Sequence, residues 1–238
     1  MGQPVRRVTL AAILVVSVTG AMIAQKESPV ASFEPPDAIP EALSFFAPFF
    51  IPKILQDEYR LKEYILSREF AQFRQVYGDV QSVDAIFDRA LHLCWNNTGE
   101  ALLICLLSTM DHRRVGVDLP HVGDLLWLPL TSEFPDEFRT RLDALPTKLY
   151  PDTPPGAAGD RDKLQHFFGG AYVALLSESA EAAERTGEFV EWGEEQFIVG
   201  GVNDWRDLRA DRQGGLFGIG LLSNIELRPS SFLSLGLR

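Results

Sequence analysis

The sequence predicts a mainly helical fold, a bundle-like helical domain with a short β-hairpin in the middle of the chain. Three observations support this prediction. Apolar residues recur at intervals of three and four over long stretches, Gly and Pro separate those stretches, and 46% of the 238 residues are hydrophobic. A chain of this length and composition can bury a substantial core in one domain or in two small ones.

The first segment has the layout of a secretory signal peptide. Arg6 and Arg7 precede an apolar run from Val8 to Ala24 whose end is rich in small residues. A run of roughly 17 residues is also at the lower limit of what spans a bilayer, so an uncleaved N-terminal anchor is the alternative. Residues 1–24 are therefore predicted to be a signal peptide or an anchor, and the rest of the protein to be periplasmic or otherwise extracytoplasmic.

A linker and an N-terminal helical part are predicted next. Residues 25–40 contain four prolines among polar residues, which is typical of a linker. Residues 41–150 then form an N-terminal helical part with the β-hairpin. Within it, the apolar pattern between Pro52 and Tyr77 predicts one amphipathic helix, which Gly78 ends.

Two further helices are predicted around the only cysteines. Ser82-Val83-Asp84 offers a cap for a helix from Ala85 to Leu93, and Thr98-Gly99-Glu100 opens a helix to about Met110. Cys94 and Cys105 could pair in an oxidising compartment, or a single continuous helix could hold them apart. We expect two buried free thiols.

The hairpin and a domain boundary follow. Two extended segments, Arg114–Leu119 and Leu125–Leu128, are separated by residues typical of a turn. The simplest interpretation of this pattern is a β-hairpin. Five prolines between Thr131 and Asp160 then predict a short helix near Asp136–Leu145 followed by a loop. This loop separates the N-terminal part from residues 151–238, the C-terminal part that carries the polar motifs.

Three helices are predicted in the C-terminal part: Lys163 to about Arg185, Glu188 to about Ile198, and Trp205 to Leu222. Pairs of glycines lie inside the first and the third of them, where each Gly costs about 1 kcal/mol relative to Ala. Close helix packing is the expected compensation. The tail from Phe232 to Arg238 is expected to be a strand or a disordered end.

The same three helices carry polar pairs at a spacing of four residues, which places both members on one helix face. Asp162 with His166 would form a metal-binding pair or an oriented acid–base pair, because a nearby carboxylate fixes the tautomer of an imidazole. Asp207 and Asp211, together with Glu195, would bind a divalent metal through oxygen. The alternatives are a helix cap at Asp162, a hydrogen-bonded core histidine at His166, and a solvated face around Asp207 and Asp211.

These motifs resemble those of VanZ-like membrane proteins and of small exported bacterial envelope proteins with an Asp-Lys-x-x-His-Phe helix. The resemblance covers about a quarter of the chain. Its elements are Asp162-Lys163 with His166-Phe167, then Glu195-Gln196-Phe197, then Asp207-Leu208 with Ala210-Asp211 and Gly214 or Gly215. The polar stretch from Ser177 to Arg185 favours the exported group, because VanZ-like proteins carry these motifs on membrane-spanning helices. The resemblance implies location and architecture more than activity.

Charge and missing signatures exclude several functions. The formal net charge of −11 repels phosphate backbones, which excludes nucleic acid as a partner. The sequence contains no Gly-x-Ser-x-Gly, His-Glu-x-x-His or Cys-x-x-Cys motif and no Gly-rich phosphate loop. Asp88 and His92 repeat the Asp-x-x-x-His spacing, and Asp111 adjoins His112, but such pairs arise often by chance.

The leading functional expectation is an exported cell-envelope protein of accessory or structural type, with a membrane-surface or envelope partner and no assigned reaction. The first alternative is a metal-dependent hydrolase that acts on a phosphoryl or acyl group, with His166 as general acid or base. The second is a small-ligand binding module with an apolar pocket. That pocket would be lined by Phe167, Phe168, Trp192 and Phe197.

Overall fold

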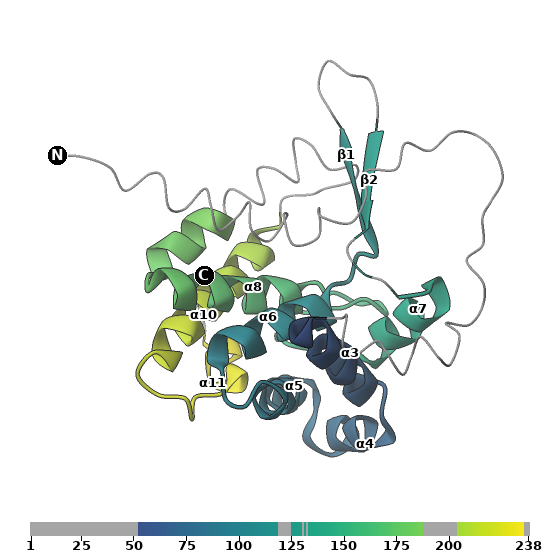
Figure 1. Ribbon diagram of the computed structural model, residues 1–238, viewed down its shortest axis with the longest axis horizontal. Coiled ribbons are helices and arrows are strands. Elements are labelled where there is room, and N and C mark those ends of the chain that lie inside the picture. The colour runs from purple at the N-terminus through teal and green to yellow at the C-terminus, as the bar shows by residue number, and fades with distance from the viewer. Residues whose placement is uncertain (1–51, 119–124, 130, 132, 188–203, 236–238) are drawn as a thin grey trace. The chain divides into compact units, whose positions relative to one another are not determined.

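The computed structural model shows a mainly helical protein, as the sequence predicts (Figure 1). It describes residues 52–118, 125–129, 131, 133–187 and 204–235. The predicted signal peptide or anchor and the predicted linker lie outside these residues, as does the helix expected from Glu188 to Ile198. The helices are α3 (Lys53–Ile65), α4 (Arg68–Tyr77), α5 (Asp79–Leu93), α6 (Thr98–Thr109), α7 (Pro135–Ala144), α8 (Lys163–Ser177), α10 (Trp205–Leu221) and α11 (Pro229–Leu233).

The single helix predicted up to Tyr77 is wrong, because Ser67 divides it into α3 and α4. The Ser67 hydroxyl accepts a hydrogen bond from the backbone N–H of Phe70 at 3.1 Å and caps α4. Gly78, with φ of 85°, then separates α4 from α5. The cap predicted at Ser82–Asp84 is also wrong, since α5 already begins at Asp79 and Ser82 lies within it.

A tight turn, rather than one continuous helix, joins α5 to α6. The Asn97 side chain accepts a hydrogen bond from the Glu100 N–H at 3.2 Å and caps α6, so the helix predicted from Thr98 is confirmed. Cys94 and Cys105 are both buried and free, as expected. Burial raises the pKa of the Cys94 thiol to about 11 and that of Cys105 well above its usual value.

The segment expected to form a hairpin contains β1 (Arg114–Asp118) and β2 (Leu125–Pro129), which run antiparallel with Gly116 opposite Trp127. The connection between them and the side chains of both strands lie outside the description. The hairpin therefore stays a prediction. The short helix predicted near Asp136–Leu145 is confirmed as α7.

The C-terminal part differs from the prediction at the end of α8 and at the start of the predicted tail. The helix expected to reach Arg185 ends at Ser177, because Glu178 adopts a left-handed conformation with φ of 54°, and a separate helix covers residues 180–187. The helix predicted from Trp205 is confirmed as α10. The tail predicted as a strand or disordered end is wrong at its first two residues, because Phe232 and Leu233 are the last residues of α11, and residues 236–238 are not described.

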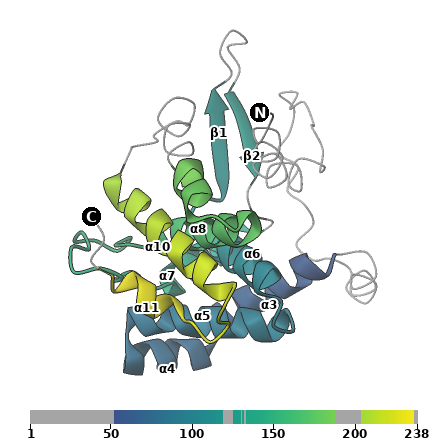
Figure 2. The same cartoon turned by 90° about the vertical axis from the view of Figure 1, so that its left-hand side faces the viewer.

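The core lies where α8 packs on both α6 and α10, and α6 in turn packs on α3 and α5 (Figure 2). Aromatic rings fill its centre. The Phe217 ring stacks on Phe167 at a centroid distance of 5.5 Å and meets Phe87 edge to face at 5.1 Å. No helix in the described part of the chain is both long and apolar enough to cross a membrane.

Candidate functional site

Two glycines allow α8 and α10 to approach each other closely at the candidate site. A Cβ added to Gly170 would lie 2.5 Å from the carbonyl oxygen of Asp211, and one added to Gly214 would lie 2.0 Å from that of Phe167. No side chain fits at such distances, so the close packing expected of these glycines is confirmed. Gly169 is different, because its Cβ would meet only the Leu106 side chain at 3.7 Å.

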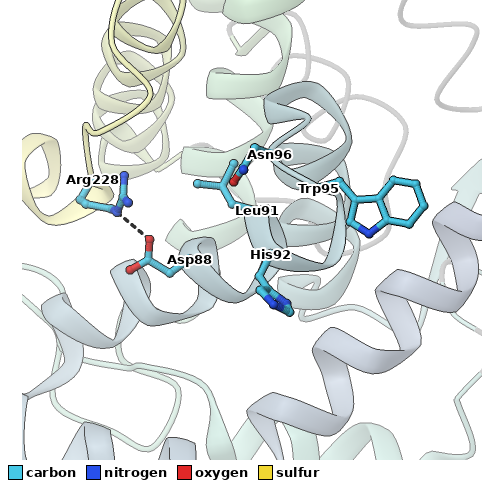
Figure 3. A pocket seen from close by; sticks show the side chains of 6 residues that line it. All are labelled: Asp88, Leu91, His92, Trp95, Asn96 and Arg228. Atoms are coloured by element: carbon cyan, nitrogen blue, oxygen red, sulfur yellow. Dashed lines mark ion pairs between the residues drawn. The ribbon is translucent and has the colours of Figure 1, made fainter.

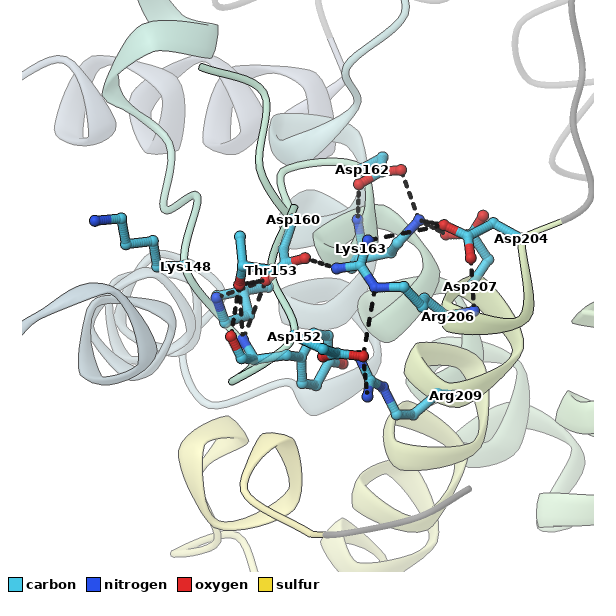
Figure 4. Close-up of polar contacts among 12 residues, drawn as sticks. Lys148, Asp152, Thr153, Asp160, Asp162, Lys163, Asp204, Arg206, Asp207 and Arg209 are labelled. Carbon is cyan, nitrogen blue, oxygen red and sulfur yellow. Dashed lines mark hydrogen bonds and ion pairs between the residues drawn. The ribbon is translucent and has the colours of Figure 1, made fainter. Parts of the chain in front are cut away.

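The Lys163 ammonium lies at the centre of the contact between the two helices. Its side chain is 1% exposed, and Nζ donates hydrogen bonds to Asp162 Oδ2 at 2.7 Å and to Asp204 Oδ2 at 2.8 Å. Asp207 Oδ1 forms an ion pair with the same Nζ at 2.6 Å. Figure 4 shows the three carboxylates turned toward this one ammonium, with Asp162 from the start of α8 and the other two from the start of α10.

The pKa values of this group follow from burial and from the ion pairs. Burial would lower the pKa of Lys163, but its hydrogen bonds to Asp162, Asp204 and Asp207 outweigh burial and hold that pKa above its usual value. Burial would raise the pKa of Asp204, but hydrogen bonds from Lys163 and from the Arg206 backbone outweigh burial and lower that pKa. Burial raises the pKa of Asp207, and the charges of His166 and Lys163 offset that effect only in part.

His166 faces α10 one turn further along α8. Its Nε2 lies 3.5 Å from Asp207 Oδ1, and its Nδ1 lies 3.4 Å from Asp211 Oδ1. Two carboxylates on two ring nitrogens match the imidazolium form, in which both nitrogens carry a proton. The second oxygen of Asp211 is buried and has no hydrogen-bond partner in the described part of the chain, where a Cβ on Gly187 would lie 2.5 Å from it.

A second set of ion pairs joins the start of α10 to the loop that precedes α8. Asp160 is fully buried and accepts backbone N–H bonds from Leu149 at 3.0 Å and from Tyr150 at 3.1 Å. The Arg206 guanidinium donates to the other oxygen of Asp160. Arg209 is paired with Asp152 at 2.8 Å (Figure 4), and its guanidinium lies over the Tyr150 ring. These contacts fasten α10 to the loop that precedes α8.

Asp111 approaches the same region from the end of α6. Its backbone N–H donates to Gln165 Oε1 at 3.4 Å, and its carboxylate pairs with His112 at 2.6 Å. Burial would raise the pKa of Asp111, but the His112 hydrogen bond and the charges of His112, Arg161 and His166 outweigh it and lower that pKa. The Asp111-His112 pair, which the sequence alone did not distinguish from a chance pair, therefore lies near His166.

The predicted site residues are thus brought together in part. Asp162 caps α8 by accepting the Lys163 N–H at 3.0 Å, as its alternative reading proposed, and also pairs with the Lys163 ammonium. His166, Asp207 and Asp211 do converge. Glu195 lies outside the described residues. Lys163 and Asp204 were missed as site residues, although Lys163 belongs to the recognised motif and Asp204 precedes a helix as a capping residue would.

The acidic group fits a metal ion poorly while Lys163 occupies it. Carboxylate oxygens of Asp162, Asp204 and Asp207 lie within 4.8 Å of one another, as metal ligands do, but the ammonium already stands between them. The predicted metal pair, Asp207 and Asp211, faces two different nitrogens of His166 rather than one common point. A cation at this centre would have to displace one of the two basic side chains.

The apolar ligand pocket expected around Phe167 and Phe168 is wrong for these two residues. Both are fully buried and belong to the core, where their rings contact each other at 5.5 Å. Trp192 and Phe197 lie outside the described residues. Comparisons of the chain with protein-family models, with curated proteins and with solved structures give no match.

Proposed function

We propose that the protein is an exported cell-envelope protein of accessory or structural type, in which a buried ionic centre joins α8 to α10. The ionic centre consists of Asp162, Lys163, His166, Asp204, Asp207 and Asp211. One observation carries the structural role: the buried Lys163 ammonium is hydrogen-bonded to Asp162 and Asp204 and forms an ion pair with Asp207. Groups that are already paired with one another hold a fold together and leave few unpaired donors, acceptors or charges for a substrate.

Export is supported by the N-terminal sequence, in which two arginines precede an apolar run with small residues at its end. The convergence of His166, Asp207 and Asp211 supports the proposed membership of the VanZ-like and small exported envelope proteins, whose motif contains these three positions. Expression of the full chain in a bacterium, followed by cell fractionation and N-terminal sequencing, tests the location. Cleavage near Ala21 or Ala24 is expected for a signal peptide, an intact membrane-bound chain for an anchor, and an intact cytosolic chain contradicts export.

A metal-dependent hydrolase is the second candidate, and one observation favours it. Asp211 keeps a buried oxygen without a hydrogen-bond partner among the described residues, a costly arrangement that a bound cation would relieve. In this version Asp207, Asp211 and Glu195 would hold the cation, which lowers the pKa of a bound water. His166 would be the general acid or base toward a phosphoryl or acyl group, and as a base it would have to be the neutral imidazole in place of the imidazolium form that its two carboxylates match.

Thermal melts separate the two candidates. The purified protein is melted with a chelator and then with zinc, manganese, magnesium or calcium, beside an Asp207→Ala, Asp211→Ala double variant. The structural role predicts melting temperatures that no cation changes. A cation-dependent rise that disappears in the double variant supports the hydrolase instead, because a ligand that binds only the folded state stabilises it.

A further inference from the structure

A pocket lies at the C-terminal end of α5, away from the ionic centre. It has a volume of about 440 Å³, within the range of small-molecule sites. Asp88 and His92, the pair that repeats the Asp-x-x-x-His spacing, contribute to its wall. Figure 3 shows the lining residues, which are Asp88, Leu91, His92, Trp95, Asn96 and Arg228.

Trp95 lines this pocket in a backbone conformation that is unfavourable for a bulky side chain. Its side chain is 83% exposed, and its backbone is left-handed with φ of 52°. Asn96 is left-handed too, with φ of 64°, but asparagine tolerates this conformation whereas a bulky aromatic residue does not. An exposed indole on a strained backbone contributes nothing to the core, and such outliers point to function.

The indole of Trp95 is held in place from one side. Lys53 Nζ lies 5.1 Å from the centroid of the ring, within cation–π range. The same ammonium pairs with the buried Asp57 and donates to the carbonyl oxygen of Leu93 at 3.3 Å. An aromatic side chain also has only two rotatable bonds, so it loses little entropy when a ligand stacks on it.

An ion pair between Arg228 and Asp88 forms the other end of the pocket. Arg228 Nε pairs with Asp88 Oδ1 at 2.6 Å, and Arg228 Nη1 donates to the carbonyl oxygens of Ile225 and Leu227 at 2.9 and 2.8 Å. This fixes both side chains. Figure 3 shows the ion pair on one side of His92 and Asn96 and the indole on the other.

We propose that this pocket binds a neutral saccharide of one or two sugar units. The C–H face of a sugar ring would stack on the indole of Trp95, which is apolar and flat. Its hydroxyls both donate and accept, and so do the Asn96 amide and the His92 imidazole, while Asp88 accepts and Arg228 donates. Because Asp88 neutralises Arg228 and the whole chain is acidic, the pocket offers no net positive charge to an anionic ligand.

The test is titration calorimetry of the purified full chain with three disaccharides, maltose, cellobiose and the disaccharide of N-acetylglucosamine, each up to about 20 mM. The proposal predicts binding of at least one. Trp95→Asn is expected to weaken that binding at least tenfold and to raise the melting temperature by about 2–4 °C, because asparagine suits the left-handed backbone. Trp205→Ala, which removes a second exposed indole, serves as the matched control and keeps binding unchanged.

Two results would overturn the proposal. The first is absence of binding by all three disaccharides to a protein whose melting curve shows it folded. The second is binding that Trp205→Ala weakens as much as Trp95→Asn does. Phosphatidylcholine vesicles with and without anionic lipid are included because exposed tryptophans also anchor proteins at membrane surfaces. Vesicle binding that depends on Trp95, without saccharide binding, assigns the residue to a membrane contact instead.

Discussion

Lys163 shows at the scale of single residues why a buried charge needs its partners. The ammonium is almost completely removed from water, and three carboxylates compensate for the lost hydration. The carboxylates depend on it in turn, Asp207 most of all, because the other two retain more contact with solvent. Loss of the ammonium should therefore destabilise the fold, whereas the effect of losing a carboxylate charge depends on the direction in which the fold shifts the pKa of that carboxylate.

Replacement of Lys163 by methionine tests this dependence. We expect Lys163→Met to lower the free energy of unfolding by about 3 kcal/mol, because it leaves a buried carboxylate without a counter-charge. Urea denaturation at pH 7 measures the change. Lys148→Met is the matched control, since the Lys148 side chain is exposed, and it should stay within about 0.5 kcal/mol of the wild type. Equal effects of both variants would contradict a structural role for the Lys163 ammonium.

Asp207 and Asp204 should respond to pH with opposite signs. The folded-state pKa of Asp207 is raised, so its contribution to stability is present below its unfolded pKa, about 3.9, and is lost as the pH rises through the folded pKa. The folded-state pKa of Asp204 is lowered, so its contribution is present above the unfolded pKa and is lost as the pH falls through the folded pKa.

Asparagine variants make this difference measurable by urea denaturation between pH 3 and pH 7. Asp207→Asn should gain stability relative to the wild type as the pH rises. Asp204→Asn should be less stable than the wild type by roughly 1 kcal/mol at pH 7, the typical net value of a hydrogen bond, and this deficit should shrink toward pH 3. Parallel pH profiles for the two variants would be the contrary result.

At the scale of elements, the contact between α8 and α10 decides where the polar residues meet. Lys163 faces Asp207, Phe167 faces Gly214, and Ala171 faces Gly218, so the two helices run in the same direction with partners 44 to 47 positions apart in the sequence. The glycines permit this approach, and the short distance between the backbones lets side chains from the two first turns reach one another. The helix contact and the ionic centre are therefore two consequences of one packing arrangement.

Alanine at two glycines of the same protein should act in opposite directions. Gly214→Ala places a methyl group against the Phe167 carbonyl oxygen, forces α8 and α10 apart, and should cost about 3 kcal/mol. Gly169→Ala meets only ordinary van der Waals contact and should gain about 0.5–1 kcal/mol from helix propensity. Thermal and urea unfolding measure both. A harmless Gly214→Ala would show that the two helices are not in close contact.

At the scale of the whole molecule, the core of the described part excludes both cysteines from solvent. Cys94 is 3% exposed and Cys105 is fully buried, and burial keeps their thiols protonated at neutral pH. The reactive thiolate is therefore scarce as well as inaccessible. Global opening of the structure should be the main route by which these sulfurs meet a reagent.

Thiol labelling with a chromogenic aromatic disulfide at pH 8 tests this view of the core. The native protein should react very slowly, and two thiols per chain should appear at once in about 6 M urea, a concentration beyond the usual unfolding range of small domains. Reductant should leave the melting temperature unchanged. Rapid labelling of one thiol before unfolding would indicate that the end of α5 opens locally.

Local patterns in the sequence predicted much of the helical part. Asn97 and Pro135 mark the starts of α6 and α7 through local capping and backbone restriction, and the glycines of α8 and α10 indicated a close helix contact. The errors lie where one backbone angle or one side-chain cap divides a regular pattern, at Ser67 and at Glu178. Apolar periodicity continues across such positions, so it does not reveal them.

The sequence by itself determined the helical class, most helix starts and the presence of His166, Asp207 and Asp211 on helix faces, because these depend on residues within a few positions of one another. Only the tertiary structure decided that Lys163 is the partner of Asp204, 41 positions away, and that Asp207 and Asp211 face different nitrogens of one imidazole. The physical reason is that an ion pair between two helices depends on their offset. That offset is set by the fit of glycines against a neighbouring backbone and not by the spacing along either helix.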